Sequence, residues 1–253
     1  MKITFLGTGT SQGVPVIACN CRVCSSQNPK DKRLRSAILI EHEGTSVVID
    51  SGPDFRQQML RSKVHHIAGL VFTHEHKDHI AGMDDIRAFN YIHKEKVNIY
   101  ATLGVQEAMH REFPYIFADF KYPGVPEVEM HTIGKQPFTI GNITLTPIEV
   151  LHYRLPVLGF RIGDFTYITD ANYIPKESME QIKGSKVLVI NALRREPHVS
   201  HFTLHEALQI IDKIGPEQAF LTHISHQLGL NDDVDAELPV HIKCAYDELV
   251  LEL

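Results

Sequence analysis

The sequence predicts an α/β protein with two β-sheets and helices on the outside. Short apolar runs bounded by Gly, Pro and Asp alternate with helical stretches along the chain. Hairpin-like strand pairs come first, followed by strand–helix units, another hairpin and further strand–helix units. This mixed order favours two sheets over one doubly wound parallel sheet. A length of 253 residues suits one large domain or two small ones, and we assign residues 1–253 to a single domain.

Each expected element follows from its local pattern. Strands are expected at ten apolar runs: Ile3–Leu6, Ala37–Ile40, Ser46–Asp50, Leu70–Phe72, Val97–Ala101, Ile143–Val150, Val157–Ile162, Thr166–Thr169, Val187–Asn191 and Ala219–Thr222. Helices are expected at Asp54–Arg61, Ile80–Asn90, Gly104–Arg111, Pro175–Lys183 and Thr203–Ile214. Thr203 and Glu206 form a capping-box pattern at the last helix, and Gly215-Pro216 marks its end.

A glycine pair near the N-terminus does not predict a nucleotide site. Gly7-Thr8-Gly9 follows a strand but lacks the third glycine and the following helix of a dinucleotide fingerprint. A tight turn is the better interpretation of these glycines.

Composition and charge limit the possible partners. Apolar residues make up 43% and charged residues 22%, the balance of a soluble globular protein. No apolar run approaches the ~20 residues of a membrane span, so no membrane partner is expected. The N-terminus lacks the apolar core of a signal peptide, which makes the cytoplasm the default location. A net charge of −6 argues against a large nucleic-acid footprint. The sequence does not fix the oligomeric state.

Potential metal ligands are concentrated directly after the expected strand Leu70–Phe72. The segment His74-Glu75-His76-Lys77-Asp78-His79 offers two His that can face one ion, followed by an Asp and a His that can face a second. Three more candidates follow other expected strands: His152, Asp170 and His223. The carboxyl ends of strands are the usual place for sites in α/β proteins, and His with carboxylate suits Zn²⁺, Mn²⁺ or Fe²⁺. The sequence therefore predicts a two-metal site.

The run Thr73–Gly82, together with those three residues, resembles the metallo-β-lactamase superfamily. The resemblance implies an αββα sandwich, with two mixed β-sheets face to face, helices on both outer faces and metals at one edge. It implies that His74, His76 and His152 hold one metal, that Asp78, His79 and His223 hold the other, and that Asp170 bridges them together with a hydroxide. Two cations lower the pKa of a shared water and clamp a displaced oxygen. Redox members of the superfamily carry a carboxylate where this chain has His76, which favours hydrolysis here.

A second metal site is predicted at a cysteine loop. Cys19, Cys21 and Cys24 lie within six residues, and a structural Zn²⁺ normally takes four ligands. His226 is a suitable fourth ligand, three residues past His223. The alternative is a set of buried or redox-active thiols. Cys244, in a further β segment, is expected to be an ordinary core residue.

The cysteine loop combined with the histidine motif resembles one branch of the superfamily, the PhnP-type cyclic phosphodiesterases, which hydrolyse phosphoribosyl cyclic phosphate. It also resembles the PqqB proteins of pyrroloquinoline quinone synthesis. Ribonuclease Z is a more distant relative, and no long Gly- and Pro-rich insertion stands around Glu127–Lys135. His201-Phe202-Thr203 resembles the His-x-Thr element of the phosphodiesterase branch, which implies that His201 gives a proton or hydrogen bond to the phosphate or leaving oxygen. His198 is the rival for this role.

The expected function is that of a di-metal hydrolase. Its substrate is expected to be a small cyclic phosphate or nucleotide-like phosphodiester, attacked by a metal-bridging hydroxide, with Asp78 orienting the nucleophile and His201 assisting the leaving oxygen. The expected cofactors are two divalent ions, Zn or Mn with Fe as a further candidate, and one structural Zn. The alternatives are a PqqB-like protein of cofactor synthesis and an RNA-end nuclease of the ribonuclease Z type.

Overall fold

The computed structural model describes residues 1–253, which form two seven-stranded sheets packed face to face. The first sheet has the order β14 (Val250–Glu252), β1 (Lys2–Gly7), β2 (Ala37–His42), β3 (Thr45–Ile49), β4 (Gly69–Val71), β5 (Val97–Ala101) and β6 (Val128–Thr132). The second has the order β13 (Ile242–Cys244), β12 (Gln218–Thr222), β11 (Val187–Asn191), β10 (Phe165–Tyr167), β9 (Leu155–Ile162), β8 (Ile143–His152) and β7 (Phe138–Ile140). Both sheets mix parallel and antiparallel pairs.

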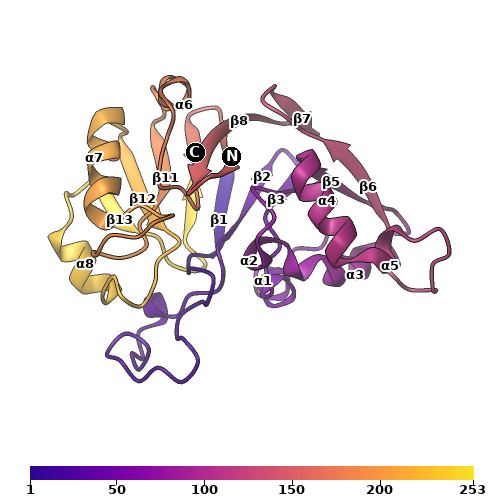
Figure 1. The fold of residues 1–253 in the computed structure, drawn as a ribbon, viewed down its shortest axis with the longest axis horizontal. Helices are drawn as coiled ribbons and strands as arrows, with labels where there is room; N and C mark the ends of the chain where they lie inside the picture. The colour runs from indigo at the N-terminus through magenta and orange to yellow at the C-terminus, as the bar shows by residue number, and fades with distance from the viewer.

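Helices cover both outer faces of this sandwich (Figure 1). The first sheet carries α1 (Phe55–Arg61), α2 (Lys77–Ile80), the 3₁₀ turn η2 (Ala81–Ile86), α3 (Arg87–His93), α4 (Leu103–Glu112) and α5 (Pro114–Phe117). The second sheet carries α6 (Lys176–Ile182), α7 (Leu204–Ile214) and α8 (Asn231–Glu237), and a short 3₁₀ turn, η1 (Pro29–Asp31), follows the cysteine loop. The predicted αββα sandwich is confirmed.

Three apolar layers hold the sandwich together. On β2, Ile38 and Ile40 face the layer between the sheets, whereas Ala37 and Leu39 face the layer under the helices. This alternation follows from the two-residue period of a strand, and it explains why a strand buried on both faces is apolar throughout. Phe160 and other large side chains of the second sheet fill the central layer from the opposite side.

The expected helix Ile80–Asn90 is wrong in its start and in its continuity. The helical backbone begins at Lys77, turns into 3₁₀ geometry over Ala81–Ile86 and resumes as α3. Gly82 lies in the 3₁₀ stretch, where a β-carbon would collide with the carbonyl oxygen of Gly52. This close approach against the loop after β3 accounts for the tighter winding. Lys94, in the left-handed conformation with φ of 60°, ends α3.

The tight-turn interpretation of Gly7 and Gly9 is also wrong. Neither residue has a positive φ, and Gly9 instead forms backbone bridges to Arg35 and Ile224. A β-carbon at Gly7 would collide with the carbonyl oxygen of Arg35, so these glycines allow backbones to approach closely. The capping box of Thr203 and Glu206 is present as expected, with Gly215 left-handed at the helix end. None of the helices has the length and apolar character needed to cross a bilayer.

Candidate metal centre

The seven candidate ligands converge from four strand ends and one helix. His74 and His76 follow β4, Asp78 and His79 lie in α2, and His152 is the last residue of β8. Asp170 and His223 follow β10 and β12. The ligand atoms of His74, His76 and His152 lie within 4.8 Å of one another, and so do those of Asp78, His79, Asp170 and His223. The two sets are the ones that the superfamily resemblance implies.

Asp170 lies between the two sets. Its Oδ2 is 3.8 Å from Nε2 of His74, whereas its Oδ1 is 3.4 Å from Nε2 of His79 and 3.0 Å from Nδ1 of His223. Burial alone would raise the pKa of Asp170, but the imidazoles of His223, His79 and His201 outweigh it and hold the pKa well below its usual value. Asp170 is therefore a carboxylate with one oxygen facing each set.

Two imidazoles present free nitrogens to the centre. Nε2 of His74 and Nε2 of His79 are buried and have no hydrogen-bond partner within the chain. A buried nitrogen without a partner costs free energy unless something binds it. Divalent cations that take neutral imidazole would satisfy both atoms, so the donor set fits two such ions.

Asp50 explains why these nitrogens are free. Its carboxylate is fully buried after β3 and accepts from Nδ1 of His79 at 2.7 Å and from Oγ1 of Thr73 at 2.9 Å. The Thr73 oxygen, having donated to Asp50, can accept from Nδ1 of His74 at 2.9 Å. Both Nδ1 atoms act as donors, so in the neutral form that binds a metal each ring directs the lone pair of its Nε2 at the centre.

Asp50 is a functional residue that the sequence reasoning missed. It stands directly after β3, as His223 stands directly after β12, and this position at a strand end is the signal that could have identified it. Asp50, Asp170 and His223 all have left-handed backbones, with φ of 68°, 55° and 53°. Such strained conformations in residues other than Gly concentrate at functional sites.

The pKa values of the two free imidazoles diverge. Burial lowers the pKa of His74 well below its usual value. Burial acts in the same direction on His79, but the carboxylates of Asp170, Asp78 and Asp50 outweigh it and raise the pKa of His79 well above its usual value. The set that contains His79 and Asp78 therefore attracts positive charge more strongly than the set that contains His74.

The cysteine loop also converges with its expected partner. Nδ1 of His226 lies 3.4 Å from Sγ of Cys19, 3.3 Å from Sγ of Cys21 and 3.5 Å from Sγ of Cys24. The edges of a tetrahedron around Zn²⁺ are about 3.6 Å long for these donors. The backbone N–H of Cys24 and the ring of His226 lower the pKa of the Cys21 thiol to about 6, which favours the thiolate. All four groups fit a structural zinc, whereas Cys244 is buried in the core under α7 and α8, as expected.

His201 lies beside the two-metal centre, and His198 lies behind it. Nε2 of His201 is buried, has no hydrogen-bond partner and is 3.4 Å from Oδ2 of Asp170. Its Nδ1 faces Nδ1 of His198 at 3.1 Å and Oγ of Ser200 at 3.1 Å. Burial lowers the pKa of His201 to about 4, so the ring is neutral at pH 7. Of the two His, only His201 has a nitrogen within reach of a candidate ligand of this centre.

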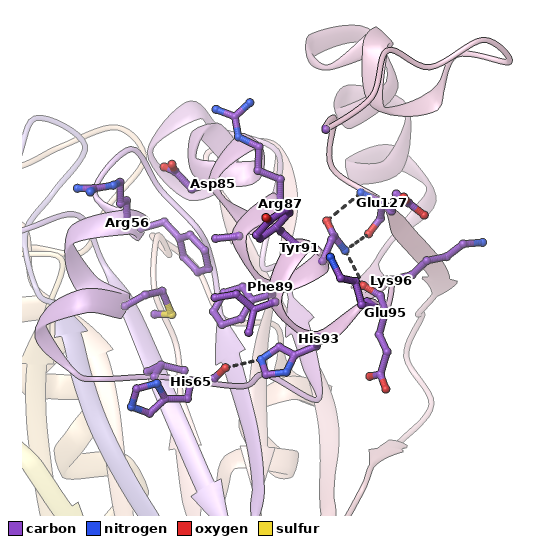
Figure 2. A pocket seen from close by; sticks show the side chains of 18 of the residues that line it. Arg56, His65, Asp85, Arg87, Phe89, Tyr91, His93, Glu95, Lys96 and Glu127 are labelled. Carbon is purple, nitrogen blue, oxygen red and sulfur yellow. Dashed lines mark hydrogen bonds between the residues drawn. The ribbon is translucent and has the colours of Figure 1, made fainter.

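A large cavity lies away from these clusters. It has a volume of about 1340 Å³ and lies between α1, α3 and the segment before β6. Phe89, Tyr91 and His93 of α3 line it, and His93 contacts the carbonyl of His65 across its floor (Figure 2). None of its lining residues belongs to a candidate metal site. The chemistry of the side chains, and not the size of the cavity, therefore locates the centre.

The fold and this centre define a protein of the metallo-β-lactamase fold. The chain belongs to the β-lactamase superfamily, since the family model for the beta-lactamase superfamily domain matches residues 45–224. Within the superfamily it is of the PhnP type. A crystal structure of a new diphosphatase from the PhnP family has 38% sequence identity and a TM-score of 0.93, covering 100% of this chain and 97% of that one.

Two further relatives place this similarity in context. An octanoyltransferase of Porphyromonas gingivalis is 38% identical over 252 residues, which cover 98% of this chain and 51% of that protein. The chain thus spans about half the length of this curated relative. Zn²⁺-bound PqqB from Methylobacterium extorquens has a TM-score of 0.80 over 100% of both chains at 18% identity, which shows a common fold.

Proposed function

We propose that the chain is a di-metal phosphodiesterase acting on a small cyclic phosphate or nucleotide-like phosphodiester. The observation that carries the proposal is the pair of free Nε2 atoms on His74 and His79. The carboxylate of Asp50 orients both rings, that of His79 directly and that of His74 through Thr73. The two sets of ligand atoms lie on opposite oxygens of Asp170. This arrangement suits two adjacent divalent ions, Zn²⁺ or Mn²⁺, with Fe²⁺ as a further candidate.

Two divalent ions bound there would supply an activated water and neutralise charge on the phosphoryl oxygens. The side chains of the chain contribute orientation. His152 is fixed by its Nδ1, which donates to the carbonyl of Ser200 at 2.7 Å. Oδ2 of Asp78 is 3.2 Å from Nε2 of His79, so Asp78 would hold a metal together with His79, and we assign it to orienting the attacking water that this metal would supply.

His201 is assigned to the leaving oxygen. When the hydroxyl of Ser200 donates to Nδ1 of His201, the ring proton is on Nε2, which faces the centre. A neutral imidazole in this state donates a hydrogen bond to a developing negative charge on the leaving group. His198 contacts the opposite side of the ring and positions it.

Octanoyl transfer, the activity that names the P. gingivalis relative, is not proposed for this chain. The chain matches only 51% of that protein, which leaves room there for a separate catalytic unit. Acyl transfer through a covalent intermediate needs an accessible nucleophile. Three of the four cysteines surround His226, and Cys244 is buried with its thiol pKa raised to about 12. No cysteine clusters with the candidate ligands of the two-metal centre.

The nuclease alternative receives less support. The segment between α5 and β6 has only ten residues, 118–127, and forms a loop beside α5 (Figure 1). The net charge of −6 also gives little attraction for an RNA backbone. We therefore favour a small diester over an RNA end.

A panel of phosphodiesters tests the proposal. The purified chain, loaded separately with Mn²⁺ and with Zn²⁺, should hydrolyse bis(p-nitrophenyl) phosphate and at least one cyclic nucleotide. His79→Ala should abolish turnover, whereas the control variant His241→Ala, at an exposed position outside every cluster, should keep it. A protein that binds two ions per centre but turns over no diester, while cleaving a thioester or a lactam, would refute the phosphodiesterase assignment.

A further inference from the structure

The turn after His152 carries an unusual residue. β8 and β9 form a hairpin in which His152 pairs with Leu155, so Tyr153 and Arg154 are its two-residue turn. Tyr153 has a φ of 59°, in the left-handed region that Gly, Asn and Asp occupy at such turns. A tyrosine here is strained without an evident structural reason. Tyr153 is 56% exposed, and its backbone N–H donates to the side chain of Asn172.

A second exposed tyrosine lies on the neighbouring loop. Tyr173 is 55% exposed, three residues after Asp170, and forms a backbone bridge with Leu151. The side chain of Asn172 links the two loops, because its Oδ1 accepts from the backbone N–H of Tyr153 at 2.6 Å. The tyrosine-bearing loops are thus fixed side by side.

The two loops also belong to the metal centre. Nδ2 of Asn172 donates to the carbonyl of Val199 at 3.2 Å, which connects them to the loop of His201. Each of the three loops therefore carries a residue of the cluster formed by His152, Asp170 and His201. The guanidinium of Arg154 lies 5.2 Å from the ring centre of Tyr153. An aromatic surface with an adjacent cation thus stands on the rim of the centre.

We propose that Tyr153, Arg154 and Tyr173 form a rim platform that stacks the base of a nucleoside phosphodiester substrate. This inference rests on the proposed phosphodiesterase function and specifies its substrate class. Every nucleobase has a π-face that stacks on an exposed aromatic ring, and an arginine beside the ring adds a cation–π contact and attracts the anionic ester. The rim is reached from solvent, so a base can lie on it while its phosphate enters the centre. The strain at Tyr153 then has a function, since Gly would fit the turn but could not stack.

Two p-nitrophenyl esters distinguish an effect on base binding from an effect on the chemical step. Thymidine 5′-(p-nitrophenyl phosphate) and methyl p-nitrophenyl phosphate release the same leaving group, and only the first carries a base. The ratio of their kcat/KM values should favour the thymidine ester and fall in Tyr153→Gly. The loss of one stacking ring corresponds to about a 5- to 150-fold loss of affinity. Tyr153→Phe should keep the ratio, because stacking does not need the hydroxyl.

A binding measurement tests the platform independently of turnover. Calorimetry should show thymidine 5′-monophosphate binding more tightly than methyl phosphate, with at least a fivefold loss of that preference in Tyr153→Gly. Both Tyr153→Gly and Tyr153→Asn suit a left-handed turn, so neither should lower Tm. The matched control is Tyr91→Ala. Tyr91 is 77% exposed with Nζ of Lys94 over its ring at 4.2 Å, but it lies at the cavity remote from the centre.

The outcomes distinguish the two proposals. A preference for the thymidine ligand that depends on Tyr153 supports the platform even if neither ester is hydrolysed, in which case the phosphodiesterase assignment fails alone. Hydrolysis of both esters with the same ratio in wild type, Tyr153→Gly and Tyr91→Ala overturns the platform alone. A lower Tm together with an unchanged binding preference would assign Tyr153 a structural role and also overturn it.

Discussion

Asp50→Asn is the most informative perturbation of the metal centre, because one carboxylate sets both free imidazole nitrogens. Asp50 accepts from the backbone N–H of Thr73 at 2.9 Å through Oδ1, and from Thr73 Oγ1 and His79 Nδ1 through Oδ2. The amide oxygen of Asn can serve the backbone N–H. Its NH₂ group then occupies the position of Oδ2 and faces two donors. His79 can avoid this conflict only by moving its proton to Nε2, the atom that faces the centre.

The expected loss follows from that change of tautomer. Removing the carboxylate partner of a ligating His typically lowers metal affinity 10- to 100-fold. This range corresponds to about 1.4–2.8 kcal/mol of binding free energy. The set containing His79 should lose affinity most, because its contact with Asp50 is direct. The set containing His74 should lose less, because that contact passes through Thr73.

Competition with a chromophoric chelator measures this loss. Metal-free wild type and Asp50→Asn are titrated with Co²⁺ in the presence of the chelator. Co²⁺ bound to the cysteine site is identified by its thiolate absorption. The chelator signal then reports Co²⁺ binding at the other sites. Asp31→Asn is the matched control, since Asp31 is equally buried and accepts from Ser26 and Asn231 away from the centre. Wild-type affinity for both centre metals in a folded Asp50→Asn protein would refute the tautomer argument.

Three further outcomes are expected. Cys21→Ser should lose one zinc per chain and lower Tm, because metal binding energy at a structural site is folding energy. His201→Ala should keep both centre metals but lose about 10²- to 10⁴-fold in turnover of diesters with poor leaving groups, and less for p-nitrophenyl esters, with His198→Ala weaker in both cases. Gly52→Ala should displace the loop that holds α2 and weaken metal binding, because its β-carbon would collide with a carbonyl of that helix, whereas Gly104→Ala, with open space around it, should be neutral.

Metal analysis, steady-state kinetics and thermal unfolding check these outcomes. Unchanged zinc content and Tm in Cys21→Ser would remove the structural zinc. Equal, small effects of the two His variants on a poor-leaving-group diester would remove the role of His201. Full metal affinity in Gly52→Ala would show that the loop after β3 tolerates the displacement.

Much of the centre is predictable because its signals are local. The segment from His74 to His79 puts four potential ligands in six residues, and the downstream candidates stand at the ends of apolar strands. No local pattern in the sequence indicates that Asp50 contacts His79. Asp50 contacts His79 across 29 positions in sequence, and only the pairing of β3 with β4 brings the two together.

The position of the unpredicted strands in the sheets explains why their sequences carry a weak signal. β6, β7 and β14 all lie at sheet edges. An edge strand is short and has less of its surface buried, so its apolar periodicity is weak. The expected helix after the histidine motif failed for a different reason. Its sequence pattern is helical, but the close approach of Gly52 and Gly82, which no local pattern reveals, tightens its second turn.

The pairing of β1 with β14 has a consequence for how the protein folds. The segment 250–252 pairs with Lys2–Thr4, so one edge of the first sheet is completed only by residues made some 250 positions later. Until then β1 exposes unpaired backbone groups on that side, and such edges promote association between nascent chains. Contacts this distant in sequence are slow to form. The helical layer of α1 to α5 is assembled from a continuous stretch of chain, so a protein halted during synthesis would protect that layer from proteolysis and amide exchange well before it protects β1.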